Sequence, residues 1–222
     1  SIFTVLVLSC FFTFYADSFW YLVNPKSEIS EKILKRKIDG HKAGCRNKNH
    51  EWLGYSRAPN CADATEYVLN GETISIHRIT TDSHGWRNIP NEGGSDLNLL
   101  FVGGSRTFGD GVSDDETYPY YVSTLLQGNG KIWANSAWGL NQLVWLFSNR
   151  KAELESMSQN GQLIVFYHAI RGHIRRTSGA YINTMRYHRN YPKYTIGESG
   201  ITYLGTLRNY SFAKYWYMTW TF

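Results

Sequence analysis

The stretch Leu99–Val112, LLFVGGSRTFGDGV, decides the fold and the candidate chemistry. It continues a nearly unbroken apolar run that starts at Leu97, and such a run is typical of a strand buried on both faces of a parallel sheet. Gly103 and Gly104 then allow the backbone to turn sharply where the strand ends. The sequence therefore predicts a buried strand leading into a glycine-rich turn that presents Ser105.

The segments that follow this turn alternate between helical and extended patterns. In the first of them, Tyr118, Tyr121, Val122 and Leu125 have the spacing of a single helix face. The expected order is helix, strand, helix and strand, at Thr117–Leu126, Lys131–Ala134, Leu140–Met157 and Leu163–Tyr167. Strands alternating with helices predict an α/β fold with a parallel sheet.

The region before residue 96 has a different organisation. Tyr67–Leu69 and Thr73–Ile79 alternate apolar and polar residues around Asn70-Gly71, which is a strong β-hairpin signal. This hairpin belongs to a predicted lead-in segment, residues 51–95. Residues 24–50 are polar and are predicted to be a linker, within which Ser30–Lys37 is expected to form a short helix.

The N-terminal stretch Ile2–Val23 is apolar and long enough to span a bilayer. Trp20 and Tyr21 would suit an interfacial belt, and the basic cluster Lys32–Lys37 follows closely. We expect residues 1–23 to be a transmembrane anchor, which would make the membrane a partner of this chain. A cleavable signal peptide and a buried core helix are the alternatives.

Composition narrows the classes of function. The chain of 222 residues has a net charge of +5, but its basic residues do not form one stripe and no nucleic-acid-binding motif is present. Nucleic acid is therefore not an expected partner, and no cofactor or metal is expected. Cys45 and Cys61 flank a polar stretch, and they either form a disulfide or remain two free thiols.

Three strand ends should converge on one edge of the sheet, because ligands of open parallel sheets bind beyond the carboxyl ends of the strands. These ends are Gly103–Ser105, Asn135–Gly139 and His168–Arg171. The Ser105 hydroxyl is a candidate nucleophile, and its backbone amide is a candidate oxyanion donor. A turn with an uninvolved serine and a phosphate-binding loop are the alternatives, although the turn lacks the usual phosphate-loop spacing.

The wider context favours the nucleophile. The segment GGSRTFGDGVSDDETYPYYVSTLL resembles the first conserved block of SGNH (GDSL-like) hydrolases, with Gly104 where that family most often has Asp. NSAWGLNQ resembles the second block, which implies that Gly139 donates its backbone amide to an oxyanion hole. The resemblance extends over about residues 52–207, and it includes LGYSRAPN and DSHGWR upstream and YPKYTIGESGITYLGTL downstream.

The third block departs from the family pattern. The sequence FYHAIRGHIRR has Arg171-Gly172 where Asn-Asp is usual, and it is similar to a membrane-attached branch with a D-H-x-x-R pattern. Arg171 is a candidate to replace the oxyanion Asn, and His173 is a candidate catalytic residue. The alternative for both is a solvated basic helix start. No D-x-x-H, the family's source of the Asp/His pair, occurs in this chain.

The resemblance implies a three-layer α/β/α, flavodoxin-like domain over residues 96–222, incomplete at its C-terminus. We expect truncation to explain the missing Asp/His pair; a catalytically dead relative, or His168 or His173 as the base, are the alternatives. The implied function is a serine esterase, or an acyltransferase of the same fold, acting on an acyl ester such as an acylated carbohydrate of the cell envelope. The domain would be anchored to the membrane and extracytoplasmic. The competing functions are an inactive envelope binding protein and, more distantly, a phosphate-binding protein.

Overall fold

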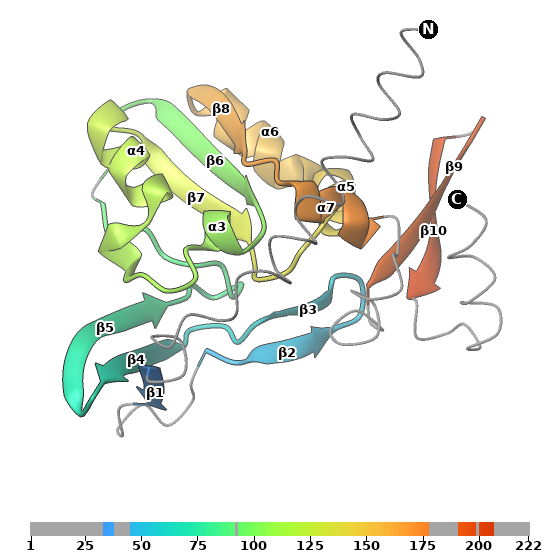
Figure 1. Cartoon of the computed structure of the whole chain (residues 1–222). Coiled ribbons are helices and arrows are strands. Elements are labelled where there is room, and N and C mark those ends of the chain that lie inside the picture. The colour runs from blue at the N-terminus through green and yellow to red at the C-terminus, as the bar shows by residue number, and fades with distance from the viewer. Residues whose placement is uncertain (1–32, 38–44, 92, 178–190, 199, 207–222) are drawn as a thin grey trace, which may run out of the picture. The chain divides into compact units, whose positions relative to one another are not determined.

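The computed structural model of the chain describes residues 33–37, 45–91, 93–177, 191–198 and 200–206 (Figure 1). The described residues divide into two compact units. One contains residues 33–37 and 65–76, and the other contains the remaining described residues, including the candidate site. The predicted anchor, residues 1–23, lies outside the described residues. No helix in the described ranges is long and apolar enough to cross a membrane.

A three-stranded parallel sheet forms the centre of the larger unit. The strands are β6 (Leu97–Gly103), β7 (Asn129–Ala134) and β8 (Gln162–Tyr167), in the order β7-β6-β8. In register, Phe101 of β6 lies opposite Ile132 of β7 and Phe166 of β8. The predicted α/β class with a parallel sheet is confirmed, and β6 is the central strand because its apolar run is buried on both faces.

Helices cover both faces of this sheet (Figure 1). They are α3 (Ser105–Phe108), α4 (Tyr118–Leu126), α5 (Leu140–Asn149), α6 (Lys151–Gln159) and α7 (Arg171–Thr177). Leu99 and Phe101 pack with Phe108 of α3 in one cluster. Leu100 and Val102 pack with Leu143 of α5 in another. Neighbouring residues of β6 thus serve opposite faces, as the period of two in a strand requires.

Two helical predictions need correction. The helix expected over Leu140–Met157 is two helices, because Arg150 between α5 and α6 has non-helical angles. On α4, Tyr121 and Leu125 are 60% and 81% exposed although they were expected on the buried face. Helix α4 is rotated so that Ser123 faces the sheet. Ser123 packs against Gly130 of β7 so closely that a Cβ on Gly130 would collide with the Ser123 hydroxyl.

The lead-in region is built from antiparallel strands. The predicted hairpin is confirmed as β4 (Ala62–Leu69) and β5 (Glu72–Thr80), with Asn70 and Gly71 at φ of 53° and 90°. The predicted short helix is wrong over Ile33–Lys37, which forms strand β1 by pairing with β4. Backbone pairing overrides a local helical pattern there. The predicted linker also contains β2 (Asn47–His50), which pairs with β3 (Gly54–Arg57).

Three further features belong to the larger unit. Cys45 and Cys61 form a disulfide with a Cα–Cα distance of 5.3 Å, which decides between the two alternatives that their spacing leaves open. The bridge is buried, next to Ala58 and Ile79. After α7, the strands β9 (Pro192–Gly197) and β10 (Gly200–Thr206) form an antiparallel hairpin. A short 3-10 helix, η1 (Asp114–Glu116), lies between α3 and α4.

Candidate active site at the carboxyl end of the sheet

Ser105 is the first residue of α3, directly after the central strand. Gly103 has a φ of +157°, and a Cβ at this position would collide with Thr107 Oγ1. Only glycine therefore fits the turn without strain. Ser105 is partly exposed, and its hydroxyl makes no hydrogen bond to any of the described residues. The turn thus presents an unengaged hydroxyl at the carboxyl end of β6.

A buried arginine holds the loop that follows Ser105. The guanidinium of Arg87 donates to Asp114 Oδ1 at 2.7 Å and to the carbonyls of Phe108, Gly109 and Val112 at 2.6–2.7 Å. Asp114 in turn accepts from the backbone and hydroxyl of Thr80. The segment DSHGWR resembles the family's upstream pattern, but nothing local in it indicates this role for Arg87. The available signal was the spacing of a lone arginine after a turn, which does not reveal its distant partners.

The loop after β7 is tied to the loop after α3. The buried Asn135 accepts from Arg57 Nε at 3.2 Å, and Ser136 Oγ donates to Asp110 Oδ1 at 2.7 Å. Arg57 also lies 3.6 Å from the Asp110 carboxylate. This network fixes two of the three strand ends against each other. None of Arg57, Asp110 or Asn135 was singled out as a site residue from the sequence.

The carbonyls of this second loop are bound by side chains behind it. Tyr55 donates to the Ser136 carbonyl at 2.6 Å, and Tyr191 donates to that of Ala137, which has a φ of 63°. Burial raises the pKa of Tyr55 to about 12 and also raises that of Tyr191. Both phenols therefore remain protonated hydrogen-bond donors, which stabilises the loop's unusual backbone.

Gly139 lies where the second strand end meets α5. Its backbone N–H donates to Gln142 Oε1 at 2.9 Å, as part of the cap of that helix. A donor engaged in this way must exchange partners before it can bind an oxyanion. The oxyanion role of Gly139 stays a prediction.

Helix α7 packs directly on the Ser105 turn. A Cβ placed on Gly104 would lie 2.8 Å from His173 Nε2 and 3.0 Å from Arg176 Nη1. Trp138 supplies the third nearest atom, and Arg171 is not among these neighbours. Arg171 is exposed as the first residue of α7. Of the four residues predicted for the site, the structure thus gathers Ser105, Gly139 and His173, and it places Arg176 where Arg171 was expected.

His173 is buried and has a lowered pKa. Its Nδ1 lies 2.8 Å from the Tyr167 hydroxyl, while its Nε2 is buried and has no hydrogen-bond partner in the part of the chain that the structure describes. Burial, followed by the charges of Arg176 and His168, lowers the pKa of His173 to about 4. The imidazole is therefore neutral at neutral pH and is a weak proton acceptor.

Acid should destabilise the folded chain through His173. Well above pH 6.5 the imidazole is neutral in both the folded and the unfolded chain, so it adds no pH dependence to the free energy of unfolding. Between pH 6.5 and about 4 the unfolded chain binds a proton that the folded chain does not, so stability falls as the pH falls. Urea denaturation of wild type and His173→Gln across this range should give curves that converge as the pH drops. Parallel curves would contradict the burial of a neutral imidazole.

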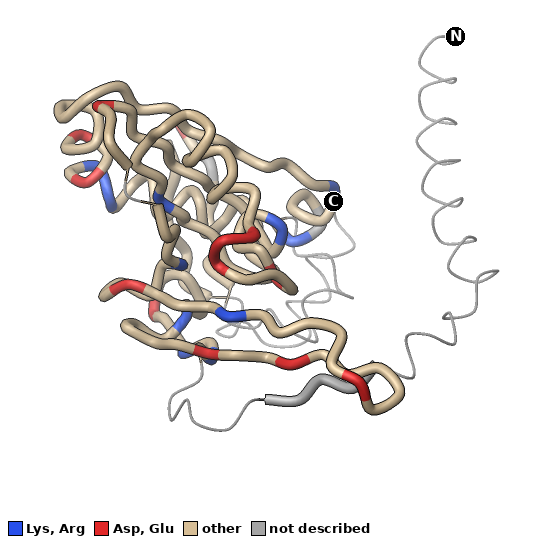
Figure 2. Tube along the Cα trace, turned by 90° about the vertical axis from the view of Figure 1, so that its left-hand side faces the viewer, with Lys and Arg blue, Asp and Glu red and all other residues tan. Residues whose placement is uncertain are grey.

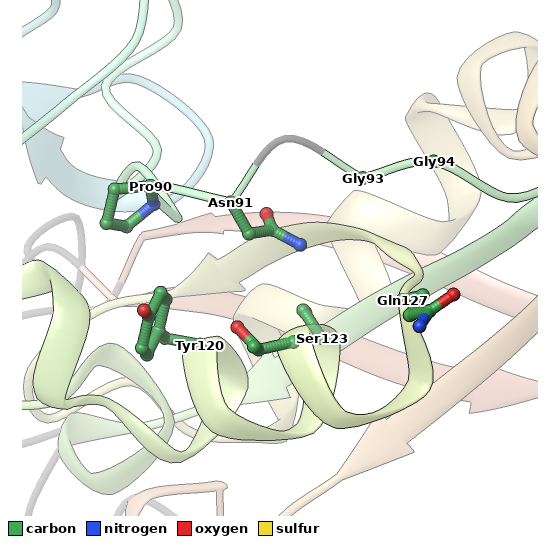
Figure 3. Close-up of a pocket in the computed structure, with 8 residues that line it drawn as sticks. Pro90, Asn91, Gly93, Gly94, Tyr120, Ser123 and Gln127 are labelled. Atoms are coloured by element: carbon green, nitrogen blue, oxygen red, sulfur yellow. The ribbon is translucent and has the colours of Figure 1, made fainter.

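A pocket of about 420 Å³ lies elsewhere (Figure 3). Its walls come from α4 and from the loop before β6, namely Pro90, Asn91, Gly93, Gly94, Tyr120, Ser123, Thr124 and Gln127. Gly94 and Gln127 precede β6 and β7, so this pocket is at the amino ends of the strands, opposite Ser105. Within the described ranges, no group of three or more His, Cys, Asp or Glu side chains is placed to hold a metal ion.

Comparison with models of known protein families and with curated proteins finds no match for this chain.

Proposed function

We propose that the chain is a serine ester hydrolase of the SGNH type that works through an acyl-enzyme on Ser105. The observation that carries the proposal is the position of Ser105. This partly exposed residue lies at the carboxyl end of the central parallel strand, in a turn that requires glycine at position 103. The resemblance of residues 103–126 to the family's first block also supports Ser105 as the nucleophile. The same resemblance supports a three-layer, flavodoxin-like domain.

In this proposal the Ser105 oxygen attacks the acyl carbonyl carbon, and the alcohol departs with a proton. Water then attacks the acyl-enzyme and releases the acid, or a second alcohol accepts the acyl group in a transferase. A base must take the serine proton in the first step. The low pKa of His173 argues against this residue as that base. Its burial next to Gly104 favours a role in positioning the turn.

We also propose that the domain lies outside the cytoplasm, held at the membrane by residues 1–23. The disulfide between Cys45 and Cys61 supports this location, because such bonds persist mainly in oxidising compartments. An acylated carbohydrate of the cell envelope is the corresponding substrate. The aromatic content of 16% suits sugar binding, although core packing uses many of the same residues.

Covalent labelling tests the proposal. A fluorophosphonate probe should label Ser105 of the folded full-length protein, and Ser105→Ala should abolish the label. Ser158→Ala is the matched control, because Ser158 is an exposed serine of α6 and takes no part in the network at the strand ends. Peptide mapping by mass spectrometry locates the label. Labelling that persists in Ser105→Ala would refute the assignment.

A catalytically inactive binding module is the second candidate. The engaged N–H of Gly139 favours it, because one expected oxyanion donor is used within the protein. The same labelling experiment separates the two functions. A folded protein that leaves Ser105 unlabelled, at probe concentrations that label a known serine esterase, supports the binding module and overturns the esterase.

A further inference from the structure

Two arginines flank the Ser105 turn without an acidic partner. Arg106 follows Ser105 directly and is exposed. On the other side, Arg176 Nη1 lies 3.0 Å from the Cβ position of Gly104, and this nitrogen donates to the Trp138 carbonyl at 2.8 Å. Within the part of the chain that the structure describes, neither guanidinium forms an ion pair. Among the described residues, Arg176 is therefore a cation beside the candidate nucleophile with no ion-pair partner, and Arg106 is a second such cation, adjacent to Ser105 in sequence.

Other arginines of the same unit are paired. Arg57 lies 3.6 Å from Asp110, Arg87 lies 2.7 Å from Asp114, and Arg150 lies 2.9 Å from Glu153. Asp110, the carboxylate nearest in sequence to Ser105, is thus already matched by Arg57. In the η1 segment, Asp114 is paired with Arg87, and Glu116 accepts from the Ser113 backbone N–H at 2.7 Å. Among the described residues, none of these carboxylates forms an ion pair with Arg106 or Arg176.

A third polar group faces the same position. His173 Nε2 is buried, has no hydrogen-bond partner among the described residues, and lies 2.8 Å from the position that a Cβ on Gly104 would occupy. After burial, the charge of Arg176 is the largest cause of the lowered pKa of His173. The positive charge of Arg176 thus acts on His173, which lies beside the turn. An anion close to this turn would be stabilised by the same field.

The basic residues do not form a broad surface for a polyanion. Figure 2 shows lysines and arginines interspersed with acidic residues along the described chain. Binding of a polyanion along an extended surface would need a continuous basic stripe. The local excess at Ser105 instead fits recognition of a single negative group at the site.

We propose that the site takes an ester that carries a fixed negative charge, a carboxylate or a phosphate, close to its scissile acyl group. The inference rests on the proposed acyl-transfer function of Ser105 and adds its substrate class. Arg106 and Arg176 bind the anionic group and so orient the acyl carbon toward Ser105. Recognition through partly exposed charges also predicts a dependence on ionic strength.

Protection from labelling tests this inference without requiring turnover. The full-length protein is treated with the fluorophosphonate in the presence of three acetamides, whose acetyl group is not readily removed: 4-acetamidobenzoate, the neutral 4-acetamidobenzamide and 4-acetamidophenyl phosphate. The anionic compounds should protect Ser105 at concentrations about fivefold lower than the neutral benzamide. The carboxylate and phosphate arms distinguish the two kinds of anion. Raising the salt concentration to about 1 M should remove the preference.

Two variants and a control locate the charge effect. Arg106→Gln alters only an exposed side chain, and Arg176→Gln removes the guanidinium beside Gly104; each should reduce the anionic preference. Lys151→Gln removes an exposed cation at the start of α6 and should leave the preference unchanged. If Ser105 is labelled but all three amides protect equally or not at all, the charge inference is overturned and the esterase proposal stands. Absence of labelling overturns both.

Discussion

Replacing Arg87 with alanine should lower the free energy of unfolding by about 3–5 kcal/mol. The side chain of Arg87 is fully buried, and it donates to Asp114 and to three carbonyls of the loop after α3. Its removal leaves the Asp114 carboxylate, which is largely buried, without its ion pair and leaves those carbonyls unsatisfied. The loop that follows Ser105 should lose its fixed geometry first, so labelling of Ser105 should decline together with stability.

Denaturant unfolding monitored by circular dichroism measures this effect. Arg87→Lys keeps the charge but not the planar set of donors, so it should recover only part of the lost stability. Arg78→Ala serves as the control, because Arg78 is an exposed arginine of β5. A loss below about 1 kcal/mol for Arg87→Ala, comparable to that of the control, would show that the network contributes little.

Gly103→Ala should destabilise the fold by about 4 kcal/mol, the sum of backbone strain and overpacking. Gly103 has a φ of +157°, and a Cβ added to it would collide with the hydroxyl of Thr107. The Thr107 side chain is buried and has little room to move away. Relief of the collision requires either a shift of β6 or a new direction for the Ser105 turn. Ser105 labelling should therefore fall even in the fraction of molecules that remains folded.

Two comparisons separate the causes of this loss. Gly111→Ala introduces the same methyl group at a φ of +88° but into open space, so it should cost only about 1 kcal/mol of strain. The double variant Gly103→Ala/Thr107→Ala removes the colliding hydroxyl, so its cost should be less than the sum of the two single changes. Additive costs would mean that the collision with Thr107 is not the source.

The features predicted well from the sequence are those that local pattern controls. The apolar run before Gly103 is enough to indicate a buried parallel strand, and Asn70-Gly71 is enough to indicate a hairpin turn. The gathering of Ser105 and His173 at one edge follows from a general property of parallel sheets. These predictions needed no knowledge of which side chains meet across the fold.

The features missed depend on contacts between distant residues. Ile33–Lys37 has a helical pattern, yet it forms a strand because β4 offers a partner edge. The face that α4 buries is set by the close approach of Ser123 to Gly130, which overrides the apolar spacing of Tyr121 and Leu125. Arg87 appears in the sequence as one more charged residue, because nothing local shows that its partners lie 21–27 positions further along the chain.

Three buried tryptophans of the core make changes at the candidate site measurable by circular dichroism. Trp86 lies 6.2 Å from Trp133 and 6.0 Å from Trp138 between ring centres, and all three are buried. Trp86 precedes the arginine that holds the Ser105 loop, and the Trp138 carbonyl binds Arg176. Near-ultraviolet circular dichroism reports such fixed aromatic packing. A rearrangement of either loop therefore changes the intrinsic spectrum of the unmodified protein, without any attached label.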